Sequence, residues 1–377
     1  MIYLDNSATT RQDDKVTEIM IKYMSQDFGN PSSLYSLGIT GEKAIKKARA
    51  QILKAMGQNS GEFYFTSGGT EADNMAIFGA AEAKKKRGNK IITSKVEHPA
   101  VLEACKRLEK RGWNLVYIDV DKECKLNMDQ LKRAIDEETV LITIMQVNNE
   151  TGAIMPIEEI ANLRDQVNKD ILLHTDSVQA FGKIPIPKCA DMISISGHKI
   201  HGPKGIGGLY VKDKVNISPF VVGGGQEKSM RSGTENVPGI AGFGESAQLI
   251  AREINGQVTE VKDYLLKAIE NNIKDIKVNG PKEGVGSILN ISFKKTRAEV
   301  ILHTLEQDEI YISTGSACSS NKKGQSHVLQ AMGLEYKDIE SALRFSLNPW
   351  NTKAEMDVVV DKLKLAVEKF RKLGSFR

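Results

Sequence analysis

The feature that most constrains the fold is a regular alternation of short, β-rich runs with helical patterns between about residues 60 and 212. Strand and helix in repeated alternation predict a mostly parallel α/β sheet with helices on both faces. Several runs are apolar throughout, as in Val140–Met145 (VLITIM), which is typical of strands buried on both sides. The strand-like runs are Glu62–Thr66, Lys90–Ser94, Leu115–Asp119, Val140–Gln146, Ile171–Thr175, Asp191–Ser196 and Gly208–Lys212.

The pattern changes beyond about residue 245. A long polar helical stretch at about Gly244–Ile273 precedes a strand-like run at Ser287–Phe293, and a Gly/Ser-rich loop follows later. A Thr-x-x-Glu capping box at Thr352 and Glu355 then opens a final amphipathic helix. This part of the chain is expected to form an α+β unit of its own.

The length of the chain favours two domains, since 377 residues is more than twice the usual domain size of about 150. We expect a large α/β domain at residues 13–250. Residues 1–12 and 251–377 are expected to form a small α+β domain that carries the Gly/Ser-rich loop at about residues 313–327.

Composition excludes several classes of protein. The 52 basic and 48 acidic residues give a formal net charge of only +4, so neither a general nucleic-acid surface nor a membrane surface is predicted. No apolar run reaches the roughly 18 residues of a membrane-spanning helix, and the start, MIYLDNSATT, has no signal-peptide pattern. The four cysteines form no CxxC pair, which argues against a disulfide framework or a zinc knuckle. We expect a cytoplasmic globular protein.

Two nucleotide-binding motifs are incomplete. Gly197–Lys204 approaches a Walker A loop, but Pro203 separates the second glycine from Lys204 and no Ser or Thr follows. No Gly-x-Gly-x-x-Gly follows the first strand-like run, so a dinucleotide site is not supported. His198 and His201 lack further ligands at metal-binding spacing, and no resident metal is predicted.

One strand–helix connection has the chemistry of an anion site. Thr66–Glu71 (TSGGTE) joins a strand-like run to a helical pattern, and its glycines let the backbone approach a ligand. The helix N-terminus adds free N–H groups and the positive end of the dipole, which suits a phosphate. On this motif alone, an ordinary strand–helix turn is an equal alternative.

A lysine lies where such a sheet binds its ligands. Lys199 follows Asp191–Ser196, and the carboxyl ends of parallel strands border the ligand crevice. Desolvation there would favour a neutral, nucleophilic amine, whereas a solvated loop lysine is the simpler alternative. Asp176, Gln179 and His98 follow other strand-like runs and favour the first interpretation. Pyridoxal phosphate needs such a set: a Schiff-base lysine, an acid beside the pyridinium nitrogen and a phosphate site.

With these residues in place, the sequence resembles cysteine desulfurases of the NifS/IscS type, within the fold-type-I pyridoxal-phosphate enzymes. The resemblance runs nearly end to end, so it is more specific than any single motif. It implies a seven-stranded, mostly parallel sheet plus a smaller α+β domain. The matching segments are Tyr3–Thr10 (YLDNSATT), Gly29–Ser33 (GNPSS), Thr66–Asn74 (TSGGTEADN), Glu97–Val101, Val147–Gly152 (VNNETG), Asp176–Gln179, Ser196–Gly205, Arg231–Val237 (RSGTENV), Ser313–Ser319 (STGSACS) and Arg344–Leu347.

The resemblance implies a role for each residue around the cofactor ring. Lys199 would carry pyridoxal 5'-phosphate as a Schiff base, and Asp176 would pair with the pyridinium nitrogen. His98 would stack on the ring and join Lys199 in catalysis. Gln179 and Asn149 would lie near the phenolic oxygen of the ring.

The resemblance also implies how the phosphate and the substrate are bound. Thr234 would reach the phosphate of the partner subunit, which implies an obligate homodimer. Arg344, with Asn149 beside it, would bind the substrate carboxylate through its planar guanidinium. The cofactor phosphate would be held within one subunit by Gly69, Thr70, Ser196, Gly197 and His198.

Cys318 is the residue that distinguishes a desulfurase from its relatives. Its neighbours are small and polar, as in an exposed loop, and Lys322 and Lys323 would favour the thiolate. The resemblance implies that Cys318 receives sulfur as a persulfide, and it is the one candidate for a transient iron–sulfur ligand. Its distance from Val328–Met332 resembles the longer-loop branch, which passes sulfur directly to acceptor proteins. Cys105 is expected in the core.

The activity that follows is removal of sulfur from L-cysteine to give L-alanine, with delivery to an iron–sulfur scaffold or a tRNA-thiolation enzyme. An aminotransferase, a selenocysteine lyase or a cysteine-sulfinate lyase on the same fold would need Lys199 but depend less on Cys318. A non-catalytic sulfur-relay protein is a further alternative, although it has no physical need for the lysine, aspartate and phosphate set.

The chain departs from the family pattern at several positions. Ser7 and Arg11 replace the usual alanine and proline of the opening motif, and Tyr35 stands where histidine is common. Asn348 and Pro349 follow the Arg-Phe-Ser-Leu segment where a glycine is usual, which would stiffen the turn beside the carboxylate site. These departures affect substrate preference and partner docking rather than the catalytic groups.

Overall fold

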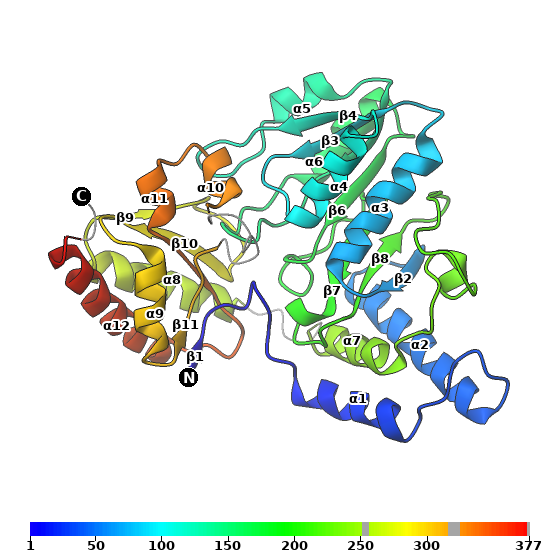
Figure 1. The fold of residues 1–377 in the computed structure, drawn as a ribbon, viewed down its shortest axis with the longest axis horizontal. Coiled ribbons are helices and arrows are strands. Elements are labelled where there is room, and N and C mark those ends of the chain that lie inside the picture. The colour runs from blue at the N-terminus through cyan, green and yellow to red at the C-terminus, as the bar shows by residue number, and fades with distance from the viewer. Residues whose placement is uncertain (251–255, 316–324, 375–377) are drawn as a thin grey trace.

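The computed structural model describes residues 1–250, 256–315 and 325–374, and its largest element is a seven-stranded sheet (Figure 1). The strand order is β2-β8-β7-β6-β5-β3-β4, with β8 antiparallel to both neighbours and the other adjacent pairs parallel. The predicted mostly parallel, seven-stranded sheet is therefore confirmed. Its strands are β2 (Glu62–Thr66), β3 (Lys90–Ser94), β4 (Asn114–Ile118), β5 (Thr139–Thr143), β6 (Leu172–Asp176), β7 (Met192–Ser196) and β8 (Gly207–Val211).

Helices cover both faces of this sheet. Neighbouring residues of a strand point to opposite faces, and on β3 both Ile91 and Ile92 are fully buried. Ile91 packs in a cluster with α3 and α4, whereas Ile92 packs in a cluster with α2, α6 and α7. Burial on both faces explains why the strands are apolar throughout. The helices are α1 (Asp14–Ser25), α2 (Ser36–Ala55), α3 (Gly69–Lys84), α4 (Pro99–Glu109), α5 (Met128–Ala134), α6 (Ile157–Val167) and α7 (Val237–Ile250).

A second, smaller unit lies beside the large sheet (Figure 1). It contains an antiparallel sheet of order β12-β10-β9 and a parallel pair of β1 with β11. Leu4, next to β1, is fully buried in the core of this unit, so the N-terminus packs on residues some 300 positions away. Its elements are β1 (Ile2–Tyr3), α8 (Gln257–Asn272), β9 (Ile276–Val278), β10 (Ile288–Phe293), α9 (Ala298–Glu306), β11 (Ile310–Tyr311), α10 (His327–Ala331), α11 (Tyr336–Glu340), β12 (Ala342–Ser346) and α12 (Lys353–Lys372).

The described parts of the helical stretch predicted at about Gly244–Ile273 lie in α7 and α8, and residues 251–255 between them lie outside the described residues. Strand β5 ends earlier than expected, since the Met145 N–H donates to the Glu97 carboxylate instead of continuing the ladder. The domain boundaries stay predictions. Within the described ranges, no helix combines the length and apolar character needed to cross a bilayer.

The capping box of α12 is confirmed and supports a first stability prediction. Thr352 Oγ1 accepts from the Glu355 N–H at 3.2 Å, and Glu355 Oε2 accepts from the Thr352 N–H at 2.9 Å. Thr352→Ala should lower the free energy of unfolding by about 1 kcal/mol in urea denaturation, because one orphan N–H loses its partner. Asp361→Ala, at an exposed position within the same helix, is the control. An equal loss in both variants would contradict a specific effect of the cap.

Candidate active site

A cavity of about 250 Å³ opens at the carboxyl ends of β5, β6 and β7. It receives side chains from both units of the structure, since Arg344 on β12 and Lys199 after β7 both line it. Many of the residues that the sequence singled out therefore meet at one place. Those that line the cavity are Gly69, Thr70, His98, Asn149, Asp176, Gln179, Ser196, His198, Lys199 and Arg344.

Lys199 is held by the backbone of the N-terminal segment. It ends the short 3-10 helix Gly197–Lys199 that follows β7, and its Nζ donates to the carbonyl oxygens of Ser7 at 2.5 Å and Ala8 at 2.7 Å. The Thr10 N–H donates in turn to the His198 carbonyl at 2.9 Å. The acceptor at position 7 is a backbone carbonyl, so serine in place of the usual alanine does not remove the contact with Lys199.

Asp176 is the last residue of β6 and is only 6% exposed. Its Oδ1 accepts a hydrogen bond from the Val178 N–H at 2.9 Å. Burial raises the pKa of Asp176 to about 6, and the Val178 N–H and the Lys199 charge oppose that rise. A buried carboxylate of this kind is stabilised by a cationic partner in the cavity.

Part of the cavity lining has the features of a phosphate site. Helix α3 begins at Gly69, so the N–H groups of its first turn point out of the helix at the cavity. Ser196 Oγ lies at the end of β7, and this buried hydroxyl has no hydrogen-bond partner among the described residues. An orphan hydroxyl beside free N–H groups is suited to bind an anion.

His98 is oriented by the start of α4. Its Nδ1 accepts from the Ala100 N–H at 3.2 Å, which places the proton of the neutral ring on Nε2. Burial, together with the charges of Lys199 and His327, lowers the pKa of His98 to about 4. The imidazole is therefore neutral near pH 7.

Arg344, on β12 of the small unit, lines the cavity and is 3% exposed. One terminal nitrogen donates to Asp5 Oδ1 at 2.7 Å and the other to the Asn149 carbonyl at 3.0 Å. Its Nε is buried and has no partner in the described part of the chain. The guanidinium is thus fixed from two sides while it keeps donor capacity for a ligand.

Two of the predicted site residues, Gly197 and Thr234, do not line this cavity. Gly197 is buried, and a Cβ there would come within 3.0 Å of Ile206, so close packing accounts for the glycine. Thr234 lines a separate cavity of about 220 Å³ together with Thr66 and Arg231. Cys318 lies outside the described residues.

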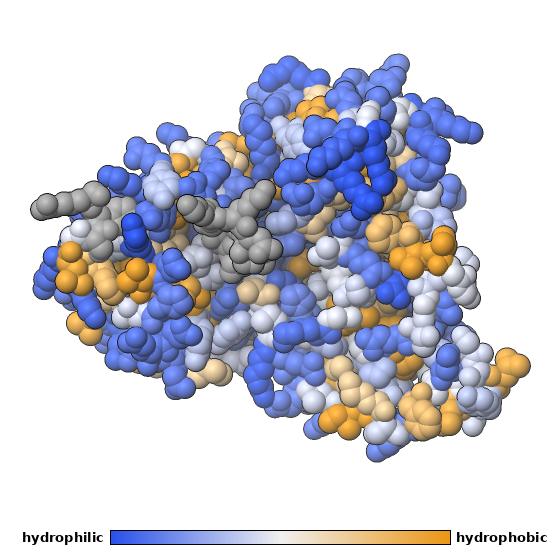
Figure 2. Space-filling view, viewed as in Figure 1, coloured by the Kyte–Doolittle hydropathy of each residue, from blue (hydrophilic) through white to orange (hydrophobic). Residues whose placement is uncertain are grey.

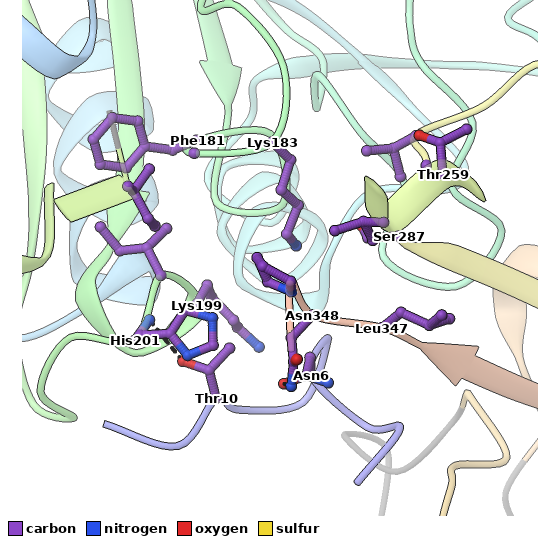
Figure 3. Close-up of a pocket in the computed structure, with 17 residues that line it drawn as sticks. Asn6, Thr10, Phe181, Lys183, Lys199, His201, Thr259, Ser287, Leu347 and Asn348 are labelled. Atoms are coloured by element: carbon purple, nitrogen blue, oxygen red, sulfur yellow. Dashed lines mark hydrogen bonds between the residues drawn. The ribbon is translucent and has the colours of Figure 1, made fainter. Parts of the chain in front are cut away.

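Sequence reasoning missed several residues of the site. Asp5 and Ser7 are in the opening motif, but no role was inferred for them because their partners lie far along the chain. Asp73 also lines the cavity; it is buried, and burial raises its pKa well above the ordinary value. Lys183 lines a second cavity of about 100 Å³ that Lys199 also enters (Figure 3).

Comparisons with known proteins agree with this geometry. The family model for class-V aminotransferases matches residues 2–359. The chain is 42% identical over 383 residues to a cysteine desulfurase IscS of Dictyoglomus turgidum, covering 100% of this chain and 97% of that protein. A solved NifS-like protein superposes with a TM-score of 0.92 at 35% identity, covering 98% of this chain and 99% of that one. A structure of SspA in complex with cysteine has a TM-score of 0.82 at 33% identity, over 93% and 100% of the two chains.

The fold and the strand-end lysine define a pyridoxal-phosphate-dependent enzyme of fold type I. Within that class, the chain belongs to the class-V aminotransferase family. The resemblance to cysteine desulfurases of the NifS/IscS type is confirmed by its relatives. Pyridoxal 5'-phosphate, carried on a lysine, is the cofactor of this family and of this chain.

The environment of His98 gives a second prediction, for the cofactor-free protein. Because burial and the charge of Lys199 both lower its pKa, His98 should remain neutral from pH 8 down to about pH 5 in an NMR titration of labelled histidine. Lys199→Met removes one of these causes and should raise the pKa of His98. The signal of the exposed His303 serves as the comparison. Protonation of His98 at pH 6 would contradict the arrangement described above.

Proposed function

We propose that this protein is an L-cysteine desulfurase that transfers sulfur to its own Cys318. L-cysteine and the Cys318 thiol give L-alanine and a Cys318 persulfide: the Cβ–S bond breaks, an S–S bond forms, and Cβ gains a proton with the electron pair. The observation that carries the proposal is the single cavity in which Lys199, Asp176 and Arg344 meet. Relatives named cysteine desulfurase over the full length support the same activity.

The residues of the cavity fit the cofactor. We assign the phosphate to the N-terminus of α3, to the orphan hydroxyl of Ser196 and to His198, and the Schiff base to Lys199. Asp176 would pair with the pyridinium nitrogen, a cation that lowers the cost of burying its carboxylate. When bound, pyridoxal phosphate supplies an electron sink for the carbon atoms of the amino acid.

Arg344 is assigned to the carboxylate of cysteine. Its contacts with Asp5 and the Asn149 carbonyl fix the plane of the guanidinium before substrate arrives. A guanidinium held in this way offers directional donors to a carboxylate. Because Arg344 and Asp5 are already in contact, the guanidinium needs little rearrangement when the carboxylate binds.

Two nitrogen atoms are placed to move protons. Lys199 Nζ is assigned to remove the Cα proton of cysteine, and it lies in the same cavity as the substrate arginine. His98 is neutral and carries its proton on Nε2, so it can donate to a group in the cavity. The Cys318 thiolate is assigned as the nucleophile that attacks the substrate sulfur.

The persulfide is then delivered to an acceptor protein, either an iron–sulfur scaffold or a tRNA-thiolation enzyme. A cysteine that must return to a free thiol after each turnover suits the reducing cytoplasm. Selenocysteine lyase and aminotransferase activities on the same fold are the alternatives, and neither depends on Cys318 as strictly.

We also propose that the enzyme works as a homodimer. Figure 2 shows apolar side chains gathered over α1 and the start of α2. Thr234 does not line the cofactor cavity of its own chain, which is consistent with a role in the site of a partner subunit. The exposed apolar residues of this surface are Ile21, Met24, Phe28, Leu34, Tyr35, Leu37 and Ile39.

Replacement of the proposed nucleophile tests the activity. Cys318→Ala should retain the yellow cofactor, which borohydride should still fix to Lys199, because the cavity is unchanged. Sulfide release from L-cysteine in the presence of a thiol should fall at least about 100-fold, because the acceptor of the sulfur atom is lost. The control is Cys189→Ala, at a partly exposed cysteine that does not line the cavity, and this variant should keep the wild-type rate. Unchanged sulfide release in Cys318→Ala would exclude the assigned role.

Mixed dimers test the role of Thr234. Thr234→Ala and Lys199→Ala homodimers should both bind the cofactor poorly, the first through a weakened phosphate site and the second through loss of the Schiff base. If Thr234 serves the partner's site, dimers formed from one chain of each contain one intact site. Spectra of the mixture should then show recovered cofactor binding. No recovery on mixing would place both residues in the same subunit's site.

A further inference from the structure

Lys183 lies in a position that the proposed mechanism does not use. It follows β6 in the turn that contains Gln179, and it extends into the second cavity, which Lys199 enters from another element (Figure 3). Of these two cavities, Lys183 lines the second and Gln179 lines the cofactor cavity. Lys183, in the wall of the second cavity, is therefore in a position to influence the cofactor cavity through Gln179.

The amide of Gln179 is held by two groups of opposite character. Lys183 Nζ donates to Gln179 Oε1 at 2.7 Å, and Gln179 Nε2 donates to the Ser7 carbonyl at 2.9 Å. The Ser7 carbonyl can only accept, and Lys183 has N–H groups to donate in either protonation state, so the two contacts favour the same orientation of the amide. Gln179 lines the cofactor cavity, and with its oxygen bound to Lys183 the second N–H of Nε2 is the donor that remains for a ligand there.

We propose that Lys183 is a positioning residue that keeps the oxygen of the Gln179 amide turned away from the cofactor and its N–H groups turned toward it. The inference rests on the proposed function, in which Gln179 lies near the phenolic oxygen of the cofactor ring. That oxygen carries negative charge, so an N–H beside it is stabilising and an amide oxygen beside it is repulsive. The contact with Ser7 alone would be a weaker constraint, since Lys199 Nζ shares the same carbonyl.

The surroundings of Lys183 also favour this contact. The described residues that line the second cavity include Lys183, Lys199 and His201 but no carboxylate. Burial, with the charges of Lys199 and Arg344, lowers the pKa of Lys183 to about 7. No carboxylate occurs among the described residues of this cavity wall, and the amide oxygen of Gln179 is an acceptor that Lys183 uses.

The pH titration of the bound cofactor's absorption tests the proposal. Loss of the N–H beside the phenolic oxygen disfavours the negative form, so Lys183→Met should raise the titration midpoint of the Schiff base. The expected shift is about one pH unit, the size of one hydrogen bond to a charged oxygen. Lys183→Arg keeps a donor and should titrate at the wild-type pH. Lys188→Met, at an exposed lysine of the same connection, should also leave the midpoint unchanged.

A double-mutant cycle separates positioning from the loss of a charge. In a Gln179→Ala background the amide is absent, so Lys183→Met should cause no further shift if Lys183 acts through Gln179. An equal shift in both backgrounds would mean that Lys183 acts through its charge alone, and would overturn the proposal. An unchanged midpoint in Lys183→Met with full cofactor binding would overturn it as well. Failure of the wild-type protein to bind pyridoxal phosphate would instead reject the proposed function.

Discussion

The packing of the N-terminal segment against the carboxyl end of β7 is the constraint on which the rest of the site depends. Its Ser7 and Ala8 carbonyls accept from Lys199 Nζ and its Thr10 N–H donates to the His198 carbonyl, while Leu4 anchors the same segment in the core of the small unit. Asp5, between these two anchors, reaches Arg344. One short segment thus joins the lysine of the large sheet to the arginine of the small one.

Electrostatics in the cavity follow from this arrangement. Three cations, Lys199, Lys183 and Arg344, lie near one another, and burial together with mutual repulsion lowers the pKa of Lys183. The buried carboxylates Asp176 and Asp73 have raised pKa values for the same dominant reason, desolvation. Burying these charged groups costs free energy, and a cofactor with a phosphate and a pyridinium nitrogen lowers that cost when it binds.

Strand-end residues could be predicted because the rule that places them is geometric. Parallel strands end at one edge of a sheet, so Asp176 at the end of β6 and Lys199 just after β7 are expected to lie close together. No comparable rule predicts which segments far apart in the chain come into contact. The Asp5–Arg344 pair spans 339 positions, and the Lys183–Gln179 bond spans only four but depends on a turn whose shape the sequence does not state.

The sequence by itself determined the sheet, the capped final helix and the family, because periodicity, capping residues and motif order are local properties of a chain. Only the tertiary structure decided which groups face one another across the two units. It separated Thr234 from the cofactor cavity of its own chain and fixed the orientation of the Gln179 amide. Those outcomes depend on the packing of the N-terminal segment between the units, and no local pattern in the sequence encodes that packing.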